Sequence, residues 1–124
     1  MSKRILLVDD NPLTRSLIRA FLESHPHIEV CGEASDGAEG LEKHIELKPD
    51  LVVLDFSMPR LNGLQAAFMI HKIAPDTPII LFTLFKDEIL DRLAQTAGVA
   101  SVVSKADEIT ILADEVDRLT SCAN

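Results

Sequence analysis

Five polar residues stand at or just beyond the ends of short apolar runs of the chain: Asp9, Asp10, Asp55, Thr83 and Lys105. If these runs are parallel strands, their carboxyl ends meet at one edge of a sheet, the edge at which open α/β sheets bind ligands. Carboxylates gathered there repel one another unless a cation neutralises them, and sites whose ligands are all oxygen atoms select a hard ion such as Mg2+. The spacing therefore predicts a Mg2+ site at the aspartates.

The same residues suit the transfer of a phosphoryl group. A carboxylate can carry this group as an acyl phosphate, whose charge a metal ion, an ammonium group and a hydroxyl donor stabilise. Asp55 is the predicted acceptor, with Lys105 and Thr83 as the two stabilising side chains. Plainer roles are also open: helix caps for Asp9 and Asp10, a solvated turn acid for Asp55, a structural strand end for Thr83, a surface charge for Lys105.

The apolar runs that lead to these residues have the continuous character of strands buried on both faces of a sheet: residues 5–8, 28–31, 51–54, 79–82 and 99–103. Helical spacing marks the segments between them, which contain Asn11-Pro12 to His25-Pro26, Asp36-Gly37 to Lys48-Pro49, Leu64 to Ile73 before Pro75, Ile89 to Ala97, and Ile109 to Leu119. Parallel neighbours need crossover helices, and these cover both faces of the sheet. The predicted fold class is therefore α/β: a doubly wound (βα)5 sandwich with a five-stranded parallel sheet.

The composition is that of an ordinary globular domain, which we expect to span residues 1–124. The chain is 47% hydrophobic and 26% charged, and its 12 basic and 20 acidic residues give a formal charge of -8. This balance lacks the basic surface that attracts nucleic acid or an anionic membrane. The apolar run at residues 5–8 is too short for a secretory signal or a membrane span. We expect a cytoplasmic chain that binds neither nucleic acid nor membranes.

Other residues that commonly bind metals have no suitable spacing. Cys31 and Cys122 lie far apart and outside any CxxC or Cys/His pattern, so reduced thiols are expected. The histidines fall in predicted loops and helices without a shared spacing, and we expect them to lie on the surface: His25, His27, His44 and His71.

The order of the motifs resembles the response-regulator receiver domains of two-component systems over essentially the whole chain. The resemblance is carried by the Asp9-Asp10 pair, the stretch D-x-x-M-P-x-x-N-G from Asp55 to Gly63, in which Pro59 directs the loop, and by Thr83 and Lys105. It implies a flavodoxin-like receiver fold and signal transduction through phosphorylation of Asp55 by a partner histidine kinase or histidine phosphotransfer protein. It also implies that Asp10, Asp55 and the backbone carbonyl of Ser57 bind Mg2+ directly, while Asp9 acts through a bound water.

By the same resemblance, the phosphoryl group acts as a switch. Thr83 would hydrogen-bond one of its oxygens and Lys105 would pair with another, and the surface of the fourth helix, fifth strand and fifth helix would change in response. Residues 9–12 and 30–34 are most similar to receivers that precede LuxR-like helix-turn-helix domains, which implies control of transcription if the chain is part of a longer protein. Two modes of homodimer remain open, one through the first and fifth helices and one through the side of the fourth. The chain is expected to be a switch with self-catalysed transfer and dephosphorylation, not a metabolic enzyme.

Two residues depart from the family pattern. Val102 stands where receivers usually carry an aromatic residue, three positions before the strand-five lysine, so a switch that depends on this aromatic is in doubt. Leu84 follows the strand-four threonine where the family favours a small residue, and its bulk predicts slow dephosphorylation. Leu84 and Phe85 with Ile89 and Leu90 could form an apolar face for a partner, although helical spacing more often reflects core packing.

Three alternatives compete with this interpretation. A phosphorylation-independent interaction module would keep the fold without the switch, but retention of every site residue argues against it. A Mg2+-dependent phosphohydrolase of the haloacid-dehalogenase kind would carry D-x-D after the first strand, which Asp9-Asp10-Asn11 does not match. A flavin-binding flavodoxin-like domain needs a phosphate-cradling loop at the same place, where Asp9 and Asp10 would repel the phosphate.

Overall fold

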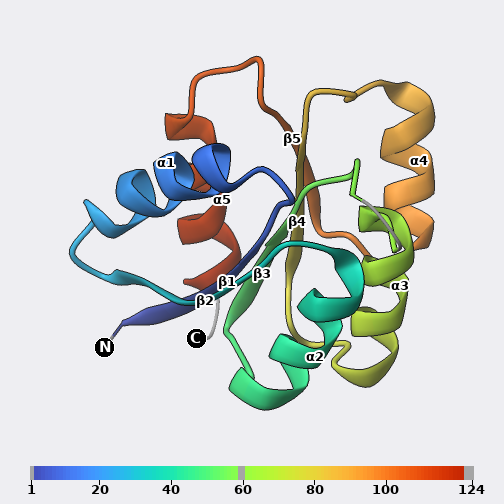
Figure 1. Ribbon diagram of the computed structural model, residues 1–124. Helices are drawn as coiled ribbons and strands as arrows, with labels where there is room; N and C mark the ends of the chain where they lie inside the picture. Colours follow the sequence, from blue (N-terminus) through green and yellow to red (C-terminus); the bar gives the residue numbers. More distant parts are fainter. Residues whose placement is uncertain (1, 59–60, 122–124) are drawn as a thin grey trace.

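A five-stranded parallel sheet lies at the centre of the computed structural model, with helices on both of its faces (Figure 1). The structure describes residues 2–58 and 61–121, so the expectations for Pro59 and Cys122 concern residues outside this part. The strands lie side by side in the order β2-β1-β3-β4-β5. In chain order the elements are β1 (Lys3–Val8), α1 (Pro12–Glu23), β2 (Ile28–Ala34), α2 (Gly37–Leu47), β3 (Leu51–Leu54), α3 (Gly63–Ile73), β4 (Ile79–Thr83), α4 (Glu88–Thr96), β5 (Ser101–Ser104) and α5 (Thr110–Thr120). The predicted doubly wound (βα)5 fold is confirmed.

The apolar core has two halves because successive residues of a strand point to opposite faces of the sheet. Ile5 and Leu7 of β1 belong to the half that is covered by α1 and α5, whereas Leu6 and Val8 belong to the half covered by α2, α3 and α4. Figure 1 shows these two helix layers on either side of the sheet. Burial on both faces explains why the strand sequences are continuously apolar. It also places the end of each strand at the border of the buried layer.

The strand limits differ from the predicted ones at two places. β2 continues beyond Cys31 to Ala34, because its register with β1 resumes after an irregularity between Ile5 and Leu6. β5 begins at Ser101, so the apolar character of Val99 does not come from strand pairing. Val99 is buried in the core, and its N–H donates to the carbonyl of Ala94 at the end of α4. The residue closes the helix and packs beneath it.

The helix that follows β1 is capped by the predicted residue. The side chain of Asn11 accepts hydrogen bonds from the N–H groups of Leu13 and Thr14, and Pro12 occupies the first helical position. Asp9 and Asp10 make no such cap. Their plainer interpretation as caps of α1 is therefore wrong, and both acids remain available to the sheet edge.

Three side chains lie in environments that differ from the ones their residue types favour. Leu13 and Leu17 of α1 are 68% and 62% exposed, while Ile18 and Leu22 face the core. His44 was expected on the surface, but it lies on the face of α2 that packs against the sheet and is 5% exposed. Within the described residues, no helix is both long and apolar enough to span a membrane.

The loop before α4 and the first turn of that helix carry a second group of exposed apolar side chains. Leu84, Phe85 and Ile89 are 66%, 57% and 69% exposed, whereas Leu90 is buried. Core packing explains only Leu90 among these residues. The other three form an apolar surface beside the end of β4.

Candidate functional site

The carboxyl ends of β1, β3, β4 and β5 meet at one edge of the sheet, as the parallel arrangement requires. Asp9 and Asp10 follow β1, Asp55 follows β3, Thr83 ends β4 and Lys105 follows β5. A cavity of about 270 Å³ opens at this edge, and its walls are formed by Asp9, Asp10, Asn11, Thr14, Asp55, Ser57, Leu84, Phe85 and Lys105. Most of the residues predicted from the sequence thus line one hollow.

The three aspartates converge in this cavity. One carboxylate oxygen of each lies within 4.8 Å of the others. Asp9 and Asp55 are 2% and 8% exposed, while Asp10 is open to solvent. Buried carboxylates at this separation need a compensating positive charge. A set of carboxylate oxygens of this kind fits a hard divalent cation such as Mg2+.

Lys105 already supplies one positive charge to the cluster. Its ammonium nitrogen lies 2.7 Å from Oδ2 of Asp9 and 3.5 Å from Oδ1 of Asp55, and the lysine side chain is 14% exposed. The backbone N–H of Lys105 donates to the carbonyl of Thr83, which anchors the residue to the end of β4. Lys105 is therefore an internal part of the cavity, and its interpretation as a surface charge is wrong.

Both carboxylate oxygens of Asp9 have partners within the chain. Oδ1 accepts a hydrogen bond of 2.9 Å from the N–H of Asn11, and Oδ2 accepts the hydrogen bond from Lys105. Among the residues that the structure describes, Asp10 and Asp55 form fewer such bonds. This difference supports the expectation that Asp9 meets a metal ion through water while the other two acids bind it directly.

The surroundings of Asp55 shift the pKa of its carboxyl group. Burial raises its pKa above the usual value for an aspartate, the positive charge of Lys105 opposes this effect, and the negative charge of Asp9 adds to it. A carboxylate that is destabilised by burial and by a neighbouring acid gains from any group that brings positive charge to it. Such perturbed acids in a cavity are typical of functional sites.

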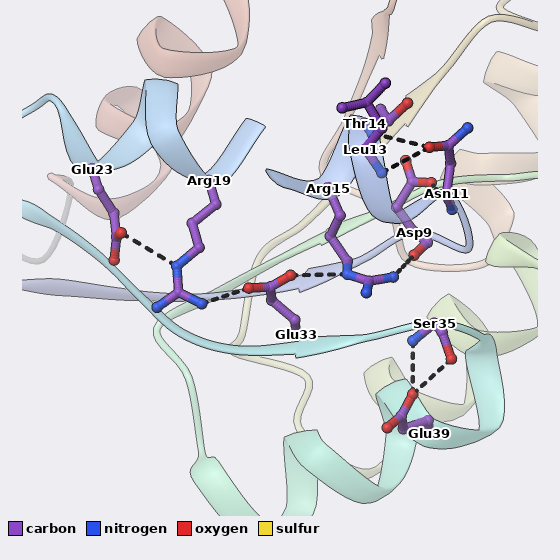
Figure 2. Close-up of polar contacts among 10 residues, drawn as sticks. All are labelled: Asp9, Asn11, Leu13, Thr14, Arg15, Arg19, Glu23, Glu33, Ser35 and Glu39. Atoms are coloured by element: carbon purple, nitrogen blue, oxygen red, sulfur yellow. Dashed lines mark hydrogen bonds and ion pairs between the residues drawn. The ribbon is translucent and has the colours of Figure 1, made fainter. Parts of the chain in front are cut away.

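An arginine pair that the sequence did not predict holds the loop after β1 in place. Arg15 donates 2.7 Å to the backbone carbonyl of Asp9 and 2.8 Å to Glu33 at the end of β2, and Arg19 also donates to Glu33 (Figure 2). Burial acts to raise the pKa of Glu33, but the hydrogen bonds from Arg19 and Arg15 outweigh it and lower the pKa. The spacing of Arg15 and Arg19 placed them on one helix face, yet nothing in the chain order pointed to Glu33.

Thr83 differs from the other site residues in its orientation. It is completely buried and is not among the residues that line the cavity. Its Oγ1 accepts a hydrogen bond of 3.1 Å from the N–H of Phe85. Leu84 and Phe85 form the wall of the cavity on this side. Ser57 also lines the cavity, in the loop that follows Asp55.

Comparison with known proteins identifies the class to which this fold and site belong. Residues 5–117 match the response regulator receiver domain family, and the chain belongs to that family. The match includes β1 from Ile5 onward, the other four strands, every acid of the cavity and Lys105.

Individual relatives agree with this assignment. The transcriptional regulatory protein LiaR of Bacillus subtilis is 38% identical over 113 residues, which cover 91% of this chain and 54% of LiaR. The chemotaxis protein CheY of Thermotoga maritima is 37% identical over 105 residues, covering 85% of this chain and 87% of CheY. A LuxR-family response regulator from Aurantimonas has a solved structure that is 29% identical, with a TM-score of 0.94 over 98% of this chain and 86% of that one. The chain thus spans about half the length of LiaR and most of the length of CheY, and LuxR-family receivers are among its similar structures.

Proposed function

We propose that this receiver domain accepts a phosphoryl group on Asp55, in a Mg2+-dependent reaction, from a histidine kinase or a histidine phosphotransfer protein. The observation that carries this proposal is the convergence of Asp9, Asp10 and Asp55 within 4.8 Å in a cavity that also holds Lys105. Three converging acids, one of which has a raised pKa, are more typical of a functional site than of a structural one. The whole of residues 1–124 is proposed to act as one receiver domain.

The transfer is a displacement at phosphorus. A carboxylate oxygen of Asp55 forms a bond to the phosphorus atom, the bond from phosphorus to the donor nitrogen breaks, and the electron pair of that bond stays with the imidazole of the donor. When Mg2+ is bound by Asp10, Asp55 and the backbone carbonyl of Ser57, it supplies positive charge to the phosphoryl oxygens. Asp9 would orient water at that ion.

The other charges of the cavity are available to stabilise the acyl phosphate. The ammonium group of Lys105, which pairs with Asp9 and Asp55, can exchange these partners for a phosphoryl oxygen without leaving the cavity. Thr83 would donate its hydroxyl to a second oxygen. The product is a changed signalling state and not a released metabolite, so the protein acts as a switch whose only chemistry is its own phosphorylation and dephosphorylation.

The output of the switch is proposed to be the surface formed by α4, β5 and α5. Similarity to LiaR and to LuxR-family receivers supports control of transcription, in a longer protein and in the cytoplasm. The acidic charge of -8 supports an output that does not involve DNA binding by this chain itself. Homodimer formation is proposed as one route by which the altered surface acts.

Intact mass after incubation with acetyl phosphate tests the proposal directly. The parent protein should gain a single phosphoryl group in the presence of Mg2+ and none in its absence, and Asp55→Asn should gain none in either condition. Absence of the adduct from the parent protein would instead favour a module that acts without phosphorylation. An adduct that persists in Asp55→Asn would show that another residue is the acceptor.

A further inference from the structure

Two phenylalanines link the loops that carry the proposed reaction. Phe56 directly follows Asp55, and Phe85 stands two residues after Thr83. Their rings meet edge to face, with centroids 6.3 Å apart and an angle of 69° between the planes. Phe85 also lines the acidic cavity, although 57% of its surface is exposed. A side chain this exposed is held by few contacts, so the ring of Phe56 is a substantial part of what positions it.

The same residue restrains the hydroxyl of Thr83. The N–H of Phe85 donates to Oγ1 of Thr83 at 3.1 Å, in a turn closed by the threonine side chain. Such a turn keeps the hydroxyl in one position, and here Thr83 is buried and does not line the cavity. A hydroxyl that is to reach a phosphoryl oxygen on Asp55 must therefore break its bond with Phe85 or pull the loop with it.

The position in β5 at which receivers usually carry an aromatic residue offers no alternative link between Thr83 and the surface. Val102 is half-buried against the core half beneath α3 and α4 and pairs with Leu81 of β4. A valine side chain carries only two methyl groups on a branched Cβ with restricted rotation, so it cannot swing between the solvent and the core as a ring can. Movement of Thr83 must be transmitted by another residue.

Building on the phosphoryl transfer proposed above, we propose that Phe85 is the positioning residue that holds Thr83 in the resting state and that reports phosphorylation in place of a strand-five aromatic. Its amide restrains the hydroxyl, and its ring anchors the loop on Phe56. When Thr83 turns to the phosphoryl group, the ring leaves Phe56 and the apolar surface of Leu84, Phe85 and Ile89 is rearranged. This surface is then what a partner distinguishes.

The energetic consequence has a definite sign. The contact between the rings stabilises the resting state only, so removing it lowers the cost of moving Thr83. An aromatic pair of this geometry contributes an amount equivalent to about a two- to tenfold change in an equilibrium constant. Phe85→Ala should therefore bind a phosphoryl mimic about two- to tenfold more tightly than the parent protein does. The alanine variant keeps the backbone N–H, so the ring contact is tested alone.

Titration with beryllofluoride in the presence of Mg2+, followed by amide chemical shifts in solution, tests the proposal. Phe85→Ala and Phe56→Ala should each bind more tightly, and the double variant should bind no more tightly than either, because both remove one contact. In a Thr83→Ala background the Phe85→Ala change should have no effect, which a merely structural role for the ring would not produce. Phe68→Ala is the matched control, because Phe68 is 52% exposed on α3 and makes its ring contact with Lys72.

The outcomes separate this proposal from the one on which it rests. If the parent protein fails to bind beryllofluoride, or binds it equally well as Asp55→Asn, phosphoryl transfer at Asp55 is refuted. If the parent protein binds it through Asp55 but Phe85→Ala binds like Phe68→Ala, only the role of Phe85 is refuted. Tighter binding that persists when Thr83 is alanine also overturns that role.

Discussion

Gly63 begins α3 directly behind the acceptor loop, and adding one methyl group there should disturb the site. A Cβ at this position would stand 2.3 Å from the backbone carbonyl oxygen of Asp55 and 2.9 Å from both Leu81 Cδ1 and Phe56 Cα. Backbone atoms cannot yield as the end of a side chain can. Relieving the overlap requires the start of α3 or the loop after β3 to move by about 1 Å, since non-bonded heavy atoms pack at about 3.5 Å.

The expected cost of Gly63→Ala follows from two opposing effects. Overpacking of this kind costs about 1–3 kcal/mol. Alanine reduces the conformational freedom of the unfolded chain, which offsets about 0.4–1 kcal/mol. The backbone of Gly63 does not have a positive φ, so no further strain arises. Gly63→Ala should therefore lower the free energy of unfolding by about 1–2 kcal/mol.

Gly32→Ala, in β2, is the matched control. A Cβ at Gly32 would meet Cδ1 of Leu47 at 2.4 Å, but this atom is the end of a flexible side chain. The leucine can change rotamer at little cost, so this variant should remain within about 0.5 kcal/mol of the parent protein. Urea unfolding followed by far-ultraviolet circular dichroism measures both variants.

The clash at Gly63 should also affect the reaction, because the atom it displaces belongs to Asp55. A misplacement of about 1 Å can reduce a rate by about 100-fold. Phosphorylation of Gly63→Ala by acetyl phosphate should thus be strongly slowed, and that of Gly32→Ala should not. If the two variants are equally stable, or are phosphorylated at equal rates, then close packing of α3 against the acceptor loop is not what makes Gly63 sensitive to substitution.

Three further predictions concern His44, Glu33 and Leu84. Burial lowers the pKa of His44 below 6.5, so at mildly acidic pH the unfolded chain binds a proton at this residue and the folded chain does not. The free energy of unfolding should therefore fall as the pH drops below 6.5. In urea unfolding, His44→Leu should reduce this dependence of stability on pH. Glu33→Gln loses charge-assisted hydrogen bonds from Arg15 and Arg19 and should cost about 1–2 kcal/mol at neutral pH. Because the pKa of Glu33 is lowered from 4.5, its contribution is lost as pH falls below that value, and the stability gap between parent and variant should then close. Leu84→Ala should speed loss of the phosphoryl adduct in timed mass spectra, since Leu84 lines the cavity; unchanged loss would contradict its role as a barrier to water.

Much of the site could be predicted because it depends on where strands end. Burial on both faces makes each strand of the parallel sheet a continuous apolar run, and the first polar residue after the run then falls at the shared edge. For Asp9, Asp10, Asp55 and Lys105, chain position alone was enough to predict a common cavity. The same reasoning failed for Val99, whose apolar side chain closes α4 instead of pairing in β5.

Helical spacing was a weaker guide, because a periodic row of apolar residues does not say which of two adjoining faces meets the core. Leu13 and Leu17 are spaced as helix-face residues and lie in solvent, whereas Ile18 and Leu22 are buried. His44 shows the reverse error. Its polar character favoured the surface, but its place on the sheet-facing side of α2 buried it.

The amino-acid sequence by itself determined the kind of fold, the edge of the sheet that carries chemistry and the residue types that meet there, since these follow from strand burial and chain direction. The tertiary structure decided which partners those residues take. Lys105 lies nearer to Asp9 than to Asp55. Arg15 donates hydrogen bonds to both the Asp9 carbonyl and Glu33, and Thr83 accepts a hydrogen bond from the N–H of Phe85. Such contacts join residues from separate elements over distances of a few ångströms. They depend on how the helices pack onto the sheet, which no local pattern in the chain records.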